Sequence, residues 1–167
     1  LSVALPYFFT REIFFTSLFL DVIYSAAAYY ILAFKFCRTK EQINVSFAAL
    51  IGSKAFVSYT TSGLENSLMF LIAAVFLWQY FAHDKFNKKQ LFWLAFTFSG
   101  ITLVRMDLTL MFIPMIVYIF LIKRDNASFG SAVGITFAGL SPFIFWELFS
   151  LFFYGFLFPN TAYVKIG

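Results

Sequence analysis

Arg105 and Asp107 are the residues whose types and spacing most clearly could do chemistry. Only Met106 separates them, and they lie between two almost wholly apolar runs, residues 91–104 and 108–122. A charge at the centre of a bilayer costs about 2.5–3.5 kcal/mol even on insertion scales, so such residues usually face a site, a cavity or a partner. A guanidinium is a forked donor for phosphate or sugar hydroxyls, and a nearby carboxylate orients it or binds hydroxyls itself. The alternative is a helix–turn–helix tip whose charges reach lipid headgroups.

Polar residues of similar kinds occur at two other places in the chain. Glu65 lies ahead of an apolar run, where it either caps the next helix or binds substrate or metal beside Asn66. Asn160, Tyr163 and Lys165 follow the last apolar run. Tyr and Lys at such a position are either interfacial anchors or a platform of hydroxyl and cation for a lipid phosphate.

Three further charges, Asp21, Lys54 and Glu147, lie inside apolar runs. We expect them to pair within a helix bundle, because an unpaired buried charge is expensive. Cys37 is the only cysteine, which excludes an internal disulfide and a metal–thiolate cluster. His83 is expected to be a solvated residue of a charged loop rather than a ligand.

The composition indicates an all-α membrane protein. Of the 167 residues, 62% are hydrophobic and 23% aromatic, and the mean hydropathy is +0.85. Soluble domains are about 45–50% apolar. The apolar runs are long rather than alternating, which favours helices over a β-barrel. The net charge of +4 comes mainly from short loops, so it does not predict a nucleic-acid partner. No phosphate-binding glycine motif occurs, which argues against a nucleotide site.

The apolar runs predict a polytopic bundle of about six spans, forming a single, partial transmembrane domain over residues 1–167. A span requires roughly 20 residues to cross a hydrocarbon core of about 30 Å. The expected spans are residues 13–36, 43–60, 67–82, 91–104, 108–122 and 131–158.

The basic loops predict the orientation. Residues 37–42, 83–90 and 123–126 contain nearly all the loop Lys and Arg, and with alternating spans they fall on one face. By the positive-inside rule that face is cytoplasmic, in the inner (plasma) membrane. The opposite face then receives residues 60–66, 105–107 and 159–165, the three polar segments introduced above.

Those three segments resemble the motifs of a known family. Thr61-Ser62-Gly63-Leu64-Glu65, Val104-Arg105-Met106-Asp107 and the segment 158–165 are similar, in order and in location, to motifs of bacterial multi-pass GT-C glycosyltransferases. The most similar pattern is that of the group containing the mycobacterial terminal arabinofuranosyltransferase. The resemblance covers most of the chain from about residue 43 onward. It implies inverting transfer of a sugar from a polyprenyl-phosphate donor to an extracytoplasmic glycan, lipid or protein.

The resemblance also implies roles for individual residues. Arg105 and Lys165 would bind the donor phosphate, and Glu65, Asp107, Asn160 and Tyr163 would bind the sugar or the acceptor. The family's general base is a carboxylate, often in an Asp pair of the first outer loop, and no Asp-Asp pair occurs here. We therefore expect the catalytic base upstream of Leu1, in a chain truncated at its N-terminus and inactive alone. Met106 replaces the family's usual Pro, and a divalent metal requirement stays open.

A different class of function remains open on the same residues. A secondary transporter, or a non-catalytic polytopic protein, would use Asp21, Lys54 and Glu147 as a relay. That hypothesis predicts that neutralising these three charges blocks uptake while the outer segments tolerate substitution. A purely structural membrane module is a third alternative, which the clustering of polar residues on one face argues against.

Overall fold

The computed structural model describes residues 7–8, 10–60, 66–123 and 129–155. Within these residues the chain is almost entirely helical and contains no β-strand, which confirms the all-α prediction for this part of the protein. The helices form two compact units, residues 1–84 and residues 85–167, which are described separately.

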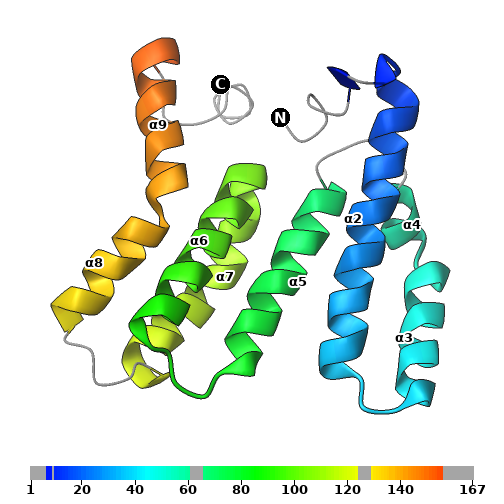
Figure 1. Ribbon diagram of the computed structural model, residues 1–167, viewed down its shortest axis with the longest axis horizontal. Helices are drawn as coiled ribbons and strands as arrows, with labels where there is room; N and C mark the ends of the chain where they lie inside the picture. The colour runs from blue at the N-terminus through cyan, green and yellow to red at the C-terminus, as the bar shows by residue number, and fades with distance from the viewer. Residues whose placement is uncertain (1–6, 9, 61–65, 124–128, 156–167) are drawn as a thin grey trace. The chain divides into compact units, whose positions relative to one another are not determined.

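The first unit is built on α2 (Ile13–Phe36) and α5 (Asn66–Ala82), which pack against each other and run in the same direction (Figure 1). The helix α2 has the bounds expected from its apolar run. At the C-terminal ends of the two helices, the Phe36 and Phe81 rings meet edge-to-face with centroids 5.6 Å apart. Lys35 directly precedes Phe36, and its Nζ lies 5.0 Å from the centre of the ring of Trp78, about one turn before Phe81. These contacts fix the relative register of α2 and α5.

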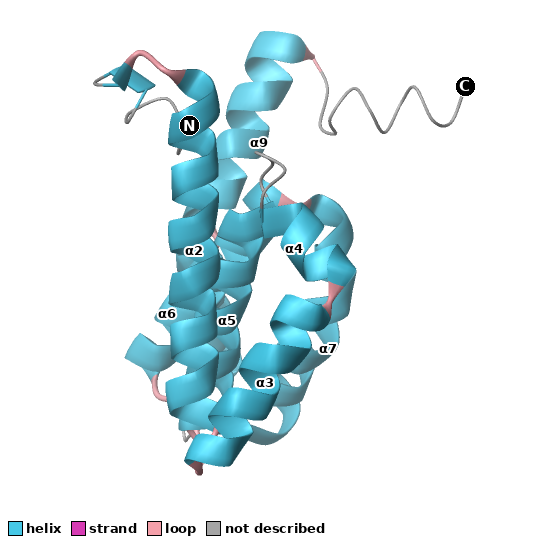
Figure 2. Ribbon diagram, turned by 90° about the vertical axis from the view of Figure 1, so that its right-hand side faces the viewer, coloured by secondary structure: helices cyan, strands magenta, loops and turns pink. Residues whose placement is uncertain are grey.

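The expected span 43–60 is divided into α3 (Lys40–Gly52) and α4 (Lys54–Thr60), with an evident turn between them in Figure 2. Gly52 has the poorest helix propensity of any residue except proline, and a serine hydroxyl competes for backbone hydrogen bonds. Ser53 is extended (φ −80°, ψ 105°). Its Oγ accepts the N–H of Phe56 at 3.4 Å and so starts α4. Local chemistry therefore breaks a segment that is apolar enough to read as continuous.

The second unit is organised around α6 (Lys88–Val104), which packs against all the other α-helices described in this unit. A capping box at Asn87 and Gln90 starts α6 three residues before the expected boundary. On one side α6 packs against η1 (Met106–Leu108) and α7 (Thr109–Tyr118), which continues into the π-helical turn Ile119–Lys123.

On its other side, α6 packs against α8 (Phe129–Gly139) and α9 (Ser141–Tyr154). The expected span 131–158 is here two helices bent by 58°. The bend has two local causes: Gly139 ends α8 against α6, and Pro142 occupies the first turn of α9, where a missing N–H costs nothing. The helix α9 ends at Gly155, which has φ +74°, and residues 156–158 lie outside the described residues.

Two stretches, Ile13–Phe36 and Met106–Lys123, are long and apolar enough to cross a membrane, and the bent pair α8–α9 is a third if it counts as one span. Large apolar side chains cover the outer surfaces of these helices; Phe152, for example, is 90% exposed. Such surfaces are stable in lipid and not in water. These features indicate a helical membrane protein.

Candidate functional site

Arg105 and Asp107 form a bidentate ion pair at the connection between α6 and α7. Arg105 follows the last residue of α6 with an extended backbone (φ −147°, ψ 102°), and Asp107 lies in the short helix η1. Arg105 Nε donates to Asp107 Oδ1 at 3.1 Å, and Nη2 donates to Oδ2 at 2.7 Å. The two side chains are 35% and 61% exposed. The pair is therefore open to a ligand while its geometry is already fixed.

Two threonines hold the helix ends beneath this tip. Thr109, the first residue of α7, donates its hydroxyl to Thr102 Oγ1 at 3.2 Å. Thr102 donates in turn to the carbonyl oxygen of Phe98 at 3.1 Å. Ile101 and Phe112 are buried on the adjoining turns. The chain of two hydroxyls joins α6 to α7 directly below Arg105, so the tip is anchored at both ends.

The arrangement limits what the tip can bind. Two of the five guanidinium N–H groups of Arg105 already serve Asp107, so the pair is formally neutral. A neutral, hydrogen-bonding pair suits a ligand that presents both an anion and hydroxyl groups. The carboxylate of Asp107, which is the more exposed of the two groups, can accept hydrogen bonds from ligand hydroxyls, and the guanidinium can donate hydrogen bonds to anionic oxygens.

The basic end of the second unit lies away from this tip. The backbone N–H of Phe86 donates to the carbonyl oxygen of Lys123 at 2.8 Å, which places the start of α6 beside the end of the α7 segment. Lys85, Lys88 and Lys89 belong to the same end. The lengths of α6 and α7 therefore separate the lysines from Arg105 and Asp107, as Figure 1 shows for the two helices.

Four predicted site residues, Glu65, Asn160, Tyr163 and Lys165, lie outside the described residues. Asn66, the neighbour of Glu65, is the first residue of α5 and is buried. Of the predicted set, the structure thus brings together Arg105 and Asp107 only, within the part of the chain that it describes.

The three charges expected to pair within the bundle have different surroundings. Asp21 is buried on α2, with 5% of its surface exposed. Lys54 is exposed at the start of α4, and Glu147 is half-buried on α9. Neither Lys54 nor Glu147 forms an ion pair with any described residue. Lys54 is exposed because a new helix begins after the break at Gly52, and the pairing of the three charges stays a prediction.

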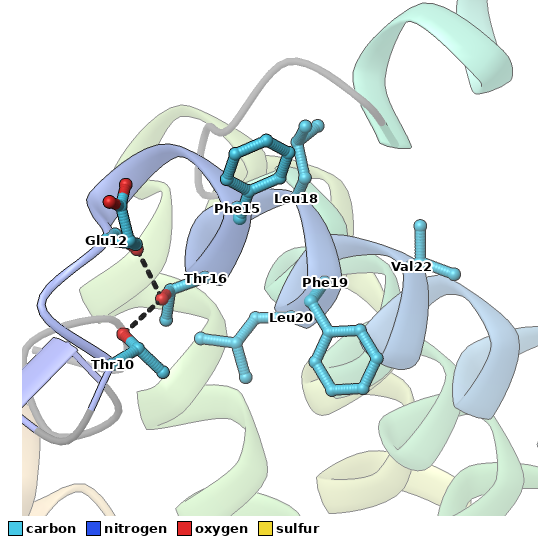
Figure 3. A pocket seen from close by; sticks show the side chains of 8 residues that line it. All are labelled: Thr10, Glu12, Phe15, Thr16, Leu18, Phe19, Leu20 and Val22. Carbon is cyan, nitrogen blue, oxygen red and sulfur yellow. Dashed lines mark hydrogen bonds between the residues drawn. The ribbon is translucent and has the colours of Figure 1, made fainter.

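Two cavities lie beside α2 among the described residues of the first unit. The larger, of about 940 Å³, follows the first half of α2 along Phe15, Phe19 and Val22. Figure 3 shows Thr10, Glu12 and Thr16 together at its polar end, where Thr16 bonds to the Glu12 carbonyl oxygen and the Thr10 hydroxyl. The smaller, of about 240 Å³, lies between α2, α3 and α4. Both are lined mainly by apolar side chains, which suits hydrocarbon chains.

The burial of several polar residues in the first unit was not predicted from the sequence as a common feature. Ser25, Thr60, Asn66 and Ser67 are all buried, as is Asp21. The one available signal was the spacing of Asp21 and Ser25, which places both on one face of a helix. The burial of the residues on α4 and α5 could not be predicted, because serine and threonine also occur at exposed helix ends.

The side chains that most often bind metal ions lie apart from one another in the described part of the chain. It contains no group of three or more His, Cys, Asp or Glu side chains placed to hold a metal ion. His83 lies at the end of α5, with Nδ1 3.2 Å from the Gln79 carbonyl oxygen. Cys37 is half-buried, with Sγ 3.9 Å from Ser46 Oγ.

No known protein family, curated protein or solved structure shows significant similarity to this chain.

Proposed function

We propose that the chain is the membrane core of a GT-C-type glycosyltransferase that takes its sugar from a polyprenyl-phosphate donor. The observation that carries the proposal is the bidentate pair of Arg105 and Asp107 at an exposed helix–helix tip. The sequence motifs that surround this pair resemble those of the family, and a fixed guanidinium–carboxylate pair suits a ligand with both phosphate and hydroxyl groups.

In this proposal the pair binds the donor and the leaving phosphate. Arg105 stabilises the negative charge that develops on the lipid phosphate as the glycosidic bond breaks, and Asp107 holds Arg105 in orientation and accepts from sugar hydroxyls. Lys165 is the second phosphate ligand, and Glu65, Asn160 and Tyr163 complete the sugar and acceptor sites. The general base is a carboxylate outside these residues.

The proposed topology has about six spans in the plasma membrane, with the basic loops in the cytoplasm and the tip on the outer face. Its support is the separation of charges along the second unit, in which the lysines and the Arg105–Asp107 pair lie at opposite ends of α6 and α7. A polyprenyl-phosphate donor presents its sugar at a membrane surface, so an interfacial tip is a suitable place for its phosphate.

The test is the binding of a fluorescent polyprenyl phosphate to the purified protein, with sugar transfer measured on the protein as its organism makes it. Arg105→Ala is expected to abolish transfer and to weaken phosphate binding, while membrane expression is retained. Arg105→Lys keeps the charge but loses the fork and is expected to be intermediate. Arg38→Ala, an exposed cation in the first unit, is the matched control. Full transfer by the Arg105→Ala variant would overturn the assigned role.

The transporter hypothesis differs in its residues. The burial of Asp21 is compatible with the transporter hypothesis. A relay of the three charges would use ion pairs, and in the described part of the chain exposed Lys54 and half-buried Glu147 form none. If neutralising Asp21, Lys54 and Glu147 blocks uptake of a solute while Arg105→Ala is tolerated, the transporter replaces the transferase.

A further inference from the structure

The smaller cavity of the first unit lies where α2, α3 and α4 pack against one another. Ser25 and Ala26 line it from α2, and side chains this small leave space between helices that larger ones would fill. Its volume is about 240 Å³. An apolar cavity of about 150 Å³ takes up benzene, so this one has room for roughly ten non-hydrogen atoms.

Tyr29 holds the wall that α3 contributes to this cavity. Its hydroxyl donates to the carbonyl oxygen of Ile43 at 2.8 Å, and its ring meets that of Phe47 with centroids 5.3 Å apart. Tyr29 and Phe47 both belong to the lining. These two contacts join α3 to α2, so side chains that are already held in place bound the cavity before any ligand binds.

The cavity opens onto an apolar surface. Val22, Phe47 and Ile51 belong to its lining and are each about half exposed. Its described lining contains no charged side chain. Because exposed apolar surface of this kind is stable in lipid, the opening admits molecules dissolved in hydrocarbon more readily than it admits ions.

Two buried hydroxyls, those of Ser25 and Thr60, interrupt the apolar lining. Ser25 is 6% exposed, and its Oγ has no hydrogen-bond partner within the part of the chain that the structure describes. A buried hydroxyl without a partner is costly. Thr60 donates its proton to the carbonyl oxygen of Val57 at 2.9 Å, so its lone pairs remain as acceptors. Ser25 thus offers a proton, and Thr60 offers lone pairs, to a molecule that occupies the cavity.

We propose that this cavity binds a membrane-dissolved alcohol of roughly ten non-hydrogen atoms. The hydroxyl of the ligand accepts from Ser25 and donates to Thr60, and its hydrocarbon part contacts Phe47 and the other apolar side chains of the lining.

Other occupants fit these walls less well. A pure hydrocarbon would leave the Ser25 proton unpaired, and an ion would find no counter-charge in the described lining. Buried water molecules need about three polar partners each, which two hydroxyls do not supply for a cavity of this volume. The proposal uses residues of the first unit only, so it stands or falls independently of the proposed sugar transfer at Arg105.

The test is thermal unfolding of the purified full chain in detergent, followed by circular dichroism, with cyclooctanol or cyclooctane added. The two probes share one ring and differ by a hydroxyl group. Because a ligand that binds only the folded state stabilises it by mass action, cyclooctanol is expected to raise the midpoint by a few degrees in a saturable manner. At the same mole fraction in the micelles, cyclooctane is expected to raise it by less than half as much.

Two variants separate the role of the hydroxyl from that of the space. Ser25→Ala removes a hydroxyl that has no partner among the described residues, so the fold should be retained, while the rise with cyclooctanol should fall to that with cyclooctane. Ala26→Phe places a ring at the exposed rim of the cavity and should abolish the rise with both probes. The matched controls are Ser58→Ala and Ala55→Phe, at exposed positions of α4 outside the described lining, and both should respond to cyclooctanol as the unmodified protein does.

Three results would overturn the proposal: equal midpoints with the two probes in the unmodified protein, an unchanged response to cyclooctanol in Ser25→Ala, or no rise with either probe. The last of these would show that lipid chains or water occupy the cavity. If Ser25→Ala does not fold, saturation-transfer NMR between the protein and cyclooctanol decides the matter: the unmodified protein should give a signal that Ala26→Phe loses and Ala55→Phe keeps.

Discussion

Ser99 on α6 caps a helix to which it is not adjacent in sequence: its Oγ accepts the backbone N–H of Phe143, in the first turn of α9, at 3.0 Å. The residue before α9, Leu140, has no side chain that can do this. Ser99 is completely buried. One hydroxyl thus satisfies a helix end inside an apolar unit, where water is not available to replace it.

Replacing Ser99 by Ala is expected to destabilise the second unit by about 1–3 kcal/mol, the cost of leaving a buried N–H without an acceptor. Unfolding in mixed detergent micelles, followed by circular dichroism, measures the change. Ser141→Ala, at the start of α9, is the control, because no hydrogen bond of the Ser141 side chain is found among the described residues. A variant as stable as the unmodified protein would show that Phe143 is satisfied in another way.

Gly139 is expected to tolerate no side chain, because a Cβ atom there would lie 2.6 Å from Ala95 Cβ and 2.7 Å from the Phe92 carbonyl oxygen. Gly139→Ala should therefore separate α8 from α6 and cost about 1–3 kcal/mol, as overpacking does in close-packed cores. Gly134→Ala is a matched control on the same helix, with no atom within 4 Å of the added Cβ.

Gly134→Ala should instead gain about 0.5–1 kcal/mol from helix propensity. The difference in unfolding free energy between the two alanine variants is the measurement. Equal effects at Gly139 and Gly134 would contradict the close approach of α8 to α6.

The Asp107→Asn variant is expected to affect ligand binding at the proposed donor site more than the stability of the fold. The pair is exposed, so its loss should change the unfolding free energy by less than about 1 kcal/mol. The free energy of ligand binding should change more than the free energy of unfolding. The affinity for a sugar-bearing polyprenyl phosphate is expected to fall about tenfold, which corresponds to about 1.4 kcal/mol, or roughly one charge-assisted hydrogen bond.

Affinity for the sugar-free carrier should fall less, because Arg105 keeps its charge. Binding titrations with both lipids measure the two affinities. An equal loss for both lipids would assign Asp107 to holding Arg105 in place and not to contacting the sugar.

The sequence by itself determined the helical class, the position of α2 and the tip at Arg105. Long apolar runs leave the backbone no stable alternative to helices in lipid, and a pair of charges between two such runs forces a connection. The cap residues Thr39 and Asn87 are also local signals, because a capping box needs only residues three apart.

Only the tertiary structure decided the close approach of α8 to α6 and the burial of polar side chains on α2, α4 and α5. Residues 131–158 read as a single span in the sequence, and the contact of Gly139 with Ala95 and Phe92 of α6 is visible only in the packed structure. Thr60, Asn66 and Ser67 look like ordinary helix-end residues, and only the packing of α2, α4 and α5 shows that they are buried, as Asp21 and Ser25 are. The physical reason is that composition decides in which environment a helix is stable, lipid or water. Contacts between turns that are distant in the sequence decide which side chains of the helix become buried.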